Sequence, residues 1–176
     1  MRLDRMGDVV LSTPVLQQLR EAFPSAWIAM MVRPVYRELV DGHPAVNEVL
    51  LYDKDGRHHG LLSTLRFARQ LRRYRFDTAL ILHPTNRSHW IAWLAGIPVR
   101  IGYHRKQAWL LTHRLPHHKQ EGTKHEAEYA LETLAVFGIA PKPPQPCVPV
   151  PPETQARVHA LLKEQGLRRP ARVVVL

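Results

Sequence analysis

The sequence is poor in cysteine, because Cys147 is the only one among 176 residues. A single cysteine excludes an internal disulfide framework and any zinc site built from several cysteines. Long apolar runs are also missing: no stretch approaches the roughly 20 consecutive apolar residues of a membrane-spanning helix. The composition, with 45% hydrophobic and 23% charged residues, is that of a folded globular protein. The scarcity of thiols favours a reducing cytoplasm.

Acidic residues are scarce in the middle of the chain. Residues 61–125 contain 12 Lys/Arg and 2 Asp/Glu, whereas residues 1–60 contain 7 and 8, and residues 126–176 contain 6 and 5. The excess behind the net charge of +10 therefore lies in the middle segment. Such a concentrated positive field attracts an anionic partner: a nucleic acid, a membrane surface, or a phosphorylated or carboxylated substrate.

Short apolar runs alternate with amphipathic stretches, which is typical of an α/β domain with a parallel sheet. Near-continuous apolar runs predict strands buried on both faces. These strands cover residues 26–32, 48–52, 76–82 and 99–101. Apolar spacing predicts helices that start at a Thr13 cap and over residues 61–71, 88–95, 126–137 and 153–165.

Particular apolar residues define the buried faces of these helices. The first helix is expected to bury Val15, Leu16, Leu19 and Phe23. The second is expected to bury Leu61, Leu62, Leu65, Ala68 and Leu71. Gly138 is placed to end the helix over 126–137, because glycine readily adopts the left-handed conformation of a C-cap.

A proline-rich segment divides the chain. The seven prolines from Pro141 to Pro152 exclude helix and central sheet and predict a semi-rigid linker. We therefore expect a domain over residues 1–140, a linker over 141–152, and the start of a second domain over 153–176. Residues 172–176 (RVVVL) are typical of a strand in that second domain. Residues 1–3 are shorter than the strand that should precede the first helix, so we expect a piece of a longer protein.

The functional interpretation depends mainly on residues 2–20. Gly7 permits a tight turn after a strand, and Asp8 lies at the mouth of that turn. Loops at the carboxyl ends of strands line the ligand crevice of open α/β sheets. A carboxylate there can accept a proton from a hydroxyl about 3 Å away. Asp8 is equally explained as a cap of the neighbouring helix, so the residues alone leave both interpretations open.

The same segment resembles the opening motif of glycosyltransferase family 9, the ADP-heptose:lipopolysaccharide heptosyltransferases. That motif is a strand, a basic residue, Gly-Asp, an apolar triplet, Ser/Thr-Pro and a leucine-rich helix. The matching residues, in order, are Gly7, Asp8, Val9, Val10, Leu11, Thr13, Pro14, Leu16, Leu19 and Arg20. Residues 93–103 (WLAGIPVRIGY) and 125–129 (HEAEY) are similar to two later family segments.

The resemblance implies the Rossmann-like N-terminal half of a GT-B fold, in which two domains face each other across a cleft. It implies that Asp8 is the general base of an inverting transfer of heptose from ADP-heptose to the inner core of lipopolysaccharide. Met6 and Gly7 match backbone positions that approach the donor. No cofactor or metal is implied. The family's donor-binding motifs are absent from the sequence, so residues 1–176 are expected to be inactive alone.

Basic side chains and a histidine are predicted to contact the acceptor. Arg87 opens the helix after the strand over 76–82, and Arg105 and Lys106 lie in a long polar loop. These cations suit the sugar acids and phosphates of a lipid-anchored acceptor. His125 matches a family position near the acceptor pocket, where it would orient the acceptor or start a helix.

The arginines of the helix over 61–71 allow two interpretations. Arg66, Arg69 and Arg73 are spaced to share one face, which is either solvated or docked on an anionic membrane surface. The second interpretation places the protein in the cytoplasm, peripheral to the inner membrane.

Other functions receive less support. The 11 histidines include a pair at 58–59 and a group at 113–118, but no carboxylate or cysteine joins them locally, so no metal site is predicted. Trp90, Trp93 and Trp109 are expected in the core or a pocket wall rather than in a base-stacking platform. A pI near 10.4 suggests a nucleic-acid-binding domain, but no helix-turn-helix, RNA-recognition or zinc module is recognisable. A related transferase with another sugar nucleotide or a protein acceptor stays open.

Overall fold

The structure is a computed structural model that describes residues 1–167. The strands are β1 (Ala29–Val32), β2 (Glu48–Leu51), β3 (Thr78–Ile81), β4 (Val99–Tyr103) and β5 (His113–Leu115). The α-helices are α1 (Met6–Val10), α2 (Thr13–Ala22), α3 (Leu61–Leu71), α4 (Asn86–Leu94), α5 (Glu126–Glu132) and α6 (Pro152–Glu164). The strand predicted over 172–176 lies outside the described residues.

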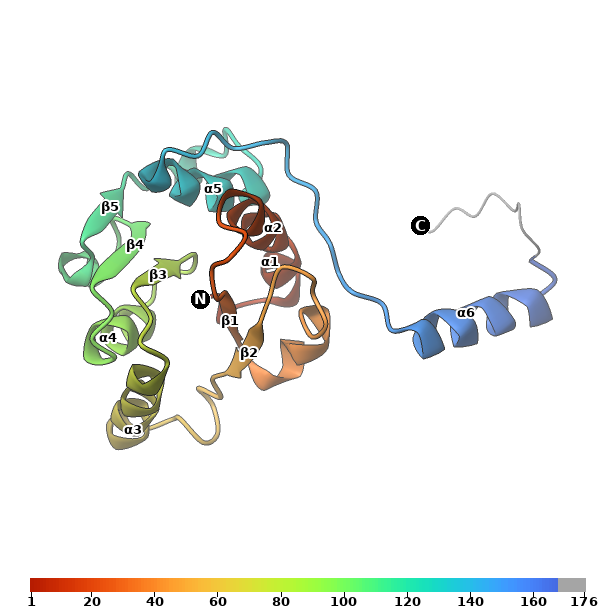
Figure 1. The fold of residues 1–176 in the computed structure, drawn as a ribbon, viewed down its shortest axis with the longest axis horizontal. Coiled ribbons are helices and arrows are strands. Elements are labelled where there is room, and N and C mark those ends of the chain that lie inside the picture. Colours follow the sequence, from red (N-terminus) through yellow and green to blue (C-terminus); the bar gives the residue numbers. More distant parts are fainter. Residues whose placement is uncertain (168–176) are drawn as a thin grey trace.

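Residues 1–3 join two sets of parallel strands. β1 pairs with β2, and β3, β4 and β5 pair in that order. Between the two sets, the Arg2 N–H donates to the Met31 carbonyl at 3.0 Å, and the Leu82 N–H donates to the Met1 carbonyl at 3.2 Å. The Met1 amino group donates to the Leu80 carbonyl at 2.7 Å. Figure 1 shows the N-terminus in this central position, between β1 and β3.

The spatial order is therefore β2, β1, residues 1–3, β3, β4, β5. The chain starts in the centre, winds outward to one side and then crosses to the other, which is the order of a Rossmann sheet. This confirms the predicted α/β fold with a parallel sheet. It also gives residues 1–3 the place of the central strand, although they are too short to form a regular one.

Helices cover both faces of the sheet, as the continuous apolar runs predicted. Alternate strand residues point to opposite faces. On one face Ala79 and Ile81 of β3 belong to an apolar cluster with Phe67, Ala68, Leu71, Ile91 and Ala92 of α3 and α4. On the other face Leu82 belongs to a cluster with Val15, Ala130, Leu131 and Leu134, and Leu80 packs against it.

Several predicted boundaries are wrong in detail. The N-cap of α2 is Ser12 rather than Thr13, and β5 was not predicted because three residues with two exposed side chains carry no apolar signal. The helix predicted over 126–137 is α5 followed by a 3₁₀ turn, Thr133–Phe137. Gly138 ends that turn with a left-handed φ of 71°, which confirms its predicted role as a cap.

The predicted buried stripe of α3 is wrong at its start. Leu61 and Leu62 are 91% and 74% exposed. Burial begins one turn later, at Thr64, and Phe67 then packs edge-on against Tyr52 with ring centroids 4.9 Å apart. Phe23 of the α2 face is also 41% exposed.

The proline-rich segment begins against α2 and then leaves the domain. Gln18 exchanges hydrogen bonds of 3.1 and 3.0 Å with the backbone of Lys142. Further along, the Cys147 N–H donates to the Thr13 hydroxyl at 2.9 Å. After this contact the chain runs out to α6, which lies apart from the domain in Figure 1 and has no buried residue.

Candidate active site

A cluster of charged side chains lies at the carboxyl edge of the sheet. Asp4 and Asp8 follow the central residues 1–3, and His83 follows β3. These two strands are neighbours, but the chain leaves them toward opposite sides of the sheet. Such a switch in direction opens the crevice in which open α/β sheets bind ligands. The cluster therefore occupies the position where a ligand is expected.

Arg2 is the centre of the cluster, with a side chain only 3% exposed. Its guanidinium pairs with Asp4 Oδ1 at 2.8 Å, Asp8 Oδ1 at 3.0 Å and Glu126 Oε1 at 2.9 Å. It also donates a hydrogen bond of 2.9 Å to the Leu82 carbonyl. One buried cation thus holds three carboxylates from two distant parts of the chain, and fixed geometry of this kind is what a buried charge requires.

The Asp8 carboxylate is held by an ion pair and is still partly exposed to solvent. Its side chain is 27% exposed, and its Oδ1 pairs with Arg2. The alternative role as a helix cap is wrong, because the N-caps of α1 and α2 are Arg5 and Ser12, and neither end has a side-chain capping bond. Asp8 instead lies in the first turn of α1 with its carboxylate directed to the cluster. The ion pair with Arg2 gives a structural reason for an aspartate at this position.

The tight turn predicted at Gly7 is also wrong. Met6 and Gly7 are the first two residues of α1, so Gly7 has a helical backbone. Met6 is 55% exposed, and a side-chain carbon added at Gly7 would meet nothing within 4 Å. The start of α1 is therefore open to an approaching molecule. Donor contact at these two residues stays a prediction.

Burial governs the protonation of two residues in the cluster. It raises the pKa of Asp4 to about 6; the charge of Arg2 opposes this shift, and Asp8 adds to it. Burial, followed by the positive charge of Arg2, lowers the pKa of His83 to about 4. His83 Nε2 lies 3.9 Å from Asp4 Oδ2. At neutral pH the imidazole is therefore uncharged, and Asp4, whose pKa of about 6 lies below 7, is mostly ionised.

Lys119 adds a second cation on the far side of the cluster. Its Nζ lies 2.5 Å from Glu126 Oε1 and over the rings of Tyr103 and Tyr129, at 5.4 and 5.7 Å from their centroids. Neither Lys119 nor Glu126 was predicted as a catalytic residue. The sequence did contain a sign of this cluster, because charged Arg2 and Asp4 alternate with apolar Met1 and Leu3 at the place of the central strand.

The residues predicted to contact the acceptor lie outside this cluster. Arg87 donates hydrogen bonds of 3.0 Å to the carbonyls of Lys54 and His59, which fixes it to the loop after β2. Arg105 and Lys106 are exposed in the turn after β4. Among the contacts of the described residues, none joins these three cations to Asp8. Their role in acceptor binding stays a prediction.

His125 starts a helix, which is one of its two predicted roles. It is the N-cap of α5: its Nδ1 accepts from the Ala127 N–H at 3.3 Å, and its own N–H donates to Glu128 Oε2 at 2.7 Å. The cap places Glu126 in the first turn of α5, where it reaches Arg2. His125 therefore acts on the cluster at least through the helix that it begins.

Two of the three tryptophans predicted in the core or a pocket wall are not in the core. Trp93 and Trp109 are 45% and 59% exposed, and their rings meet the Trp90 ring edge-on, with centroids 5.5 and 5.7 Å apart respectively.

Residues 1–167 contain no group of three metal-binding side chains that could hold an ion. Within the same residues, no helix is both long and apolar enough to cross a membrane.

Sequence comparison adds the family to this geometry. Residues 64–175, more than half of the chain, match the family model described as glycosyltransferase family 9 (heptosyltransferase). The chain belongs to glycosyltransferase family 9. No curated protein matches it at a significant level. The family match begins after the motif of residues 2–20, so it supports the resemblance independently of that motif.

Solved structures share the fold. A family 9 glycosyltransferase from Veillonella parvula has a TM-score of 0.84 and 24% identity, over 95% of this chain and 49% of its own. ADP-heptose lps heptosyltransferase II of E. coli has a TM-score of 0.71 and 22% identity, over 96% and 52%. E. coli heptosyltransferase WaaC with ADP has a TM-score of 0.67 and 19% identity, over 83% and 50%. The chain thus spans about half the length of these proteins, as expected for the N-terminal half of a GT-B fold.

Proposed function

We propose that this chain is the acceptor-side half of an inverting glycosyltransferase that moves heptose from ADP-heptose to the inner core of lipopolysaccharide. The observation that carries the proposal is the Asp8 carboxylate, paired with buried Arg2 through one oxygen and 27% exposed at the switch point of the sheet. The family match supports this substrate class. So do the names of two neighbours, one an ADP-heptose lps heptosyltransferase and one a heptosyltransferase with ADP.

Asp8 would act as the general base. Arg2 holds Oδ1 at 3.0 Å, and the Asp8 side chain, 27% exposed, can meet an acceptor hydroxyl. As the hydroxyl oxygen attacks the anomeric carbon, its proton passes to Asp8, the bond to ADP breaks, and the anomeric configuration inverts. The open start of α1 at Met6 and Gly7 gives the donor room to approach from the same side.

The positive middle of the chain would bind the acceptor and its membrane. Arg87, Arg105 and Lys106 offer cations to sugar acids and phosphates. Arg66 and Arg69 are exposed on α3, which suits contact with anionic lipid at about 1 kcal/mol for each nearby cation. We infer a cytoplasmic protein, peripheral to the inner membrane, with residues 1–140 as the acceptor domain, 141–152 as linker and 153–176 as the start of the donor domain.

A chimera tests the proposal. Residues 1–140 joined to the donor half of E. coli ADP-heptose lps heptosyltransferase II should transfer heptose to a heptose-free lipopolysaccharide core, whereas residues 1–176 alone should not. Asp8→Asn should lower the transfer rate by about 10²–10⁴-fold, the usual contribution of a general base. Asp41→Asn is the matched control, because Asp41 forms an exposed ion pair with Arg37. An Asp8→Asn rate within about threefold of the parent would exclude Asp8 as the base.

A further inference from the structure

Three tryptophan side chains meet on one surface of the domain. Trp90 and Trp93 belong to α4, and Trp109 belongs to the 3₁₀ turn Ala108–Leu110. The Trp90 ring contacts the other two edge-on, and yet Trp93 and Trp109 stay 45% and 59% exposed. We call these three residues the tryptophan cluster. Large apolar groups that gather on a surface mark a site where a partner binds.

The tryptophan cluster lies on the helical layer that covers one face of the sheet. Buried residues of α3, α4 and the 3₁₀ turn belong to one apolar core, so all three elements lie on the same side. At the start of α4, Arg87 donates to the carbonyl of His59, just before α3. Directly after α3, Arg72 donates to the carbonyl of Leu94, at the end of α4. The two helices therefore run side by side in the same direction, and their outer sides form one surface.

Cations and a leucine occupy the part of this surface that belongs to α3. The side of α3 that faces the core carries Thr64, Phe67, Ala68 and Leu71. With about 3.6 residues per turn, Leu62, Arg66 and Arg69 lie on the opposite, outer side of the helix. All three are exposed, Leu62 by 74%. The outer surface of the layer thus combines guanidinium groups on α3 with indole rings on α4 and the turn.

Carboxylates are missing from the sequence of this layer. From residue 56 to residue 120 the only acidic residue is Asp77, which lies directly before β3 and outside the helices. Neither α3 nor α4 contains a carboxylate that could neutralise the arginines. The surface is therefore complementary to an anionic partner.

The indole rings indicate which anionic partner fits. Tryptophan has an apolar ring with one polar N–H, and such side chains collect where the hydrocarbon of a bilayer meets its headgroups. The rings of the tryptophan cluster meet edge-on rather than forming the platform on which nucleic-acid bases stack. Indole rings, an exposed leucine and arginines on one surface are typical of a protein that lies in the membrane interface.

The chain that follows the domain leaves it on the other face of the sheet. The proline-rich segment bonds to Gln18 and Thr13 of α2, and Val15 of α2 packs with Leu82 on the face opposite to α3 and α4. Figure 1 shows α6 on the far side of the domain from α3 and α4. The described part of the chain therefore leaves the tryptophan cluster uncovered and accessible to a partner.

We propose that the tryptophan cluster, together with Leu62, Arg66 and Arg69, docks on an anionic lipid bilayer. The indole rings enter the interface between headgroups and acyl chains, and the guanidinium groups pair with lipid phosphates. This inference deepens the proposed function by naming the docking face, and it rests on that function only for a membrane-anchored acceptor.

The docked orientation has a consequence for the candidate active site. Because α3 and α4 each follow a strand, they begin at the carboxyl edge of the sheet, where Asp8 lies. With both helices lying along the bilayer, this edge opens along the membrane surface. A lipid-anchored acceptor is presented to Asp8 from there.

Vesicle binding by residues 1–176 tests this inference. With vesicles of equal parts phosphatidylglycerol and phosphatidylcholine, we expect cosedimentation, a blue shift of tryptophan fluorescence, and quenching by brominated acyl chains. The double variant Trp93→Ser, Trp109→Ser should bind at least about tenfold more weakly and lose most of the quenching, because two indole rings no longer leave water. Trp27→Ser is the matched control, since Trp27 is 47% exposed in the loop before β1, outside the tryptophan cluster.

A second pair of variants separates charge from insertion. Arg66→Gln with Arg69→Gln should weaken binding about tenfold and make it less sensitive to salt, whereas bound protein should still be quenched. Arg5→Gln with Arg157→Gln removes the same charge from exposed positions outside the layer. That control should change binding by less than about threefold, because its charges lie far from the bilayer.

Three results would overturn the proposal. The first is absence of binding to the anionic vesicles at low salt, and the second is equal binding by the tryptophan double variant and the parent. The third is dimerisation by sedimentation that the double variant abolishes, because a second copy would then cover the tryptophan cluster. The assay needs neither donor nor acceptor sugar, so a chimera without transfer activity would count against the proposed function and leave this result unchanged.

Discussion

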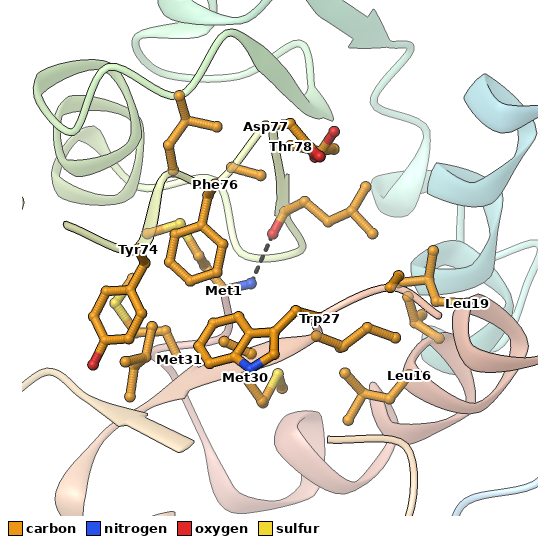
Figure 2. A pocket seen from close by; sticks show the side chains of 18 of the residues that line it. Met1, Leu16, Leu19, Trp27, Met30, Met31, Tyr74, Phe76, Asp77 and Thr78 are labelled. Atoms are coloured by element: carbon orange, nitrogen blue, oxygen red, sulfur yellow. Dashed lines mark hydrogen bonds between the residues drawn. The ribbon is translucent and has the colours of Figure 1, made fainter. Parts of the chain in front are cut away.

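The two edges of the sheet differ in the chemistry of their side chains. At the carboxyl edge, buried Arg2 is bound to three carboxylates and a carbonyl. At the amino edge, an apolar cavity of about 510 Å³ lies between β1 and β3 (Figure 2). Residues 1–3 separate the two, with the side chain of Arg2 at one edge and Met1 at the other. The comparison shows that buried charges hold one edge of the sheet together, whereas mainly apolar side chains line the other.

The largest effect is expected from Arg2→Met. This change removes the cation that compensates Asp4, Asp8 and Glu126, and breaking a buried ion pair from one side costs about 3–5 kcal/mol. Urea unfolding measures the loss. Arg5→Met, on the same segment but exposed, should change the free energy of unfolding by less than about 0.5 kcal/mol. Equal effects of the two substitutions would show that the charged edge contributes no special stability.

Truncating a core side chain in the paired part of the sheet should cost more stability than truncating one beside the cavity. Ile101 is 0% exposed within the paired part of the sheet, and Ile101→Ala should cost about 2–5 kcal/mol. Met30 is also buried, but it lines the apolar cavity at the amino edge of the sheet. Because fewer atoms contact a side chain beside a cavity, Met30→Ala should cost at least about 1 kcal/mol less than Ile101→Ala. Equal losses in urea unfolding would indicate that the cavity is closed in solution.

The pH dependence of stability sharpens the account of the charged edge. The raised pKa of Asp4, about 6, means that its contribution to stability is present below pH 4 and lost as the pH rises to 6. The lowered pKa of His83, about 4, gives the opposite slope, because its contribution appears as the pH rises from 4 to 6.5. The two slopes partly cancel in the parent protein.

Single substitutions should separate these slopes. Asp4→Asn should leave stability rising between pH 4 and 6.5, and His83→Gln should leave it falling between pH 4 and 6. Each change is on the order of 1 kcal/mol, because both side chains are partly exposed and screened. Urea unfolding at half-unit intervals of pH measures both. Parallel curves for the two variants would contradict the assignment.

The smallest effect concerns His125. Loss of its capping bonds in His125→Ala should cost about 0.5–1 kcal/mol and loosen the start of α5, which carries Glu126. His118→Ala is the control, because His118 forms only an exposed pair with Glu121 and should change stability by less than about 0.5 kcal/mol. Thermal unfolding of both variants measures the two losses of stability. If His118→Ala destabilises the protein as much as His125→Ala, the capping bonds of His125 contribute no particular stability.

Much of the fold could be predicted from the sequence because it depends on local apolar patterns. The runs over 26–32 and 76–82 contain β1 and β3, and Gly138 ends a helical segment as predicted. The patterns failed where tertiary packing decides burial: Leu61 is apolar and helical, yet it is 91% exposed. β5 is held by pairing to β4 rather than by apolar side chains of its own.

The site was only partly predictable. Asp8 was found through its motif, but its geometry depends on Arg2 and Glu126, which lie 124 residues apart in the sequence. Spacing rules cannot bring such distant residues together. Gly7 was assigned to a turn because glycine often marks one, whereas the short helix α1 contains it. The apolar cavity at the amino edge could not be predicted, because its lining residues belong to separate elements.

Chemical rescue tests the central claim, that Asp8 removes the acceptor proton, most directly. In the chimera with a donor half, Asp8→Ala should abolish most of the transfer and leave a hole beside the side chain of Arg2. Sodium formate should then raise the rate in proportion to its concentration by about tenfold or more, because a small carboxylate can take the place of the missing base. Asp41→Ala should not respond. Transfer by Asp8→Ala at the parent rate without formate would contradict the account.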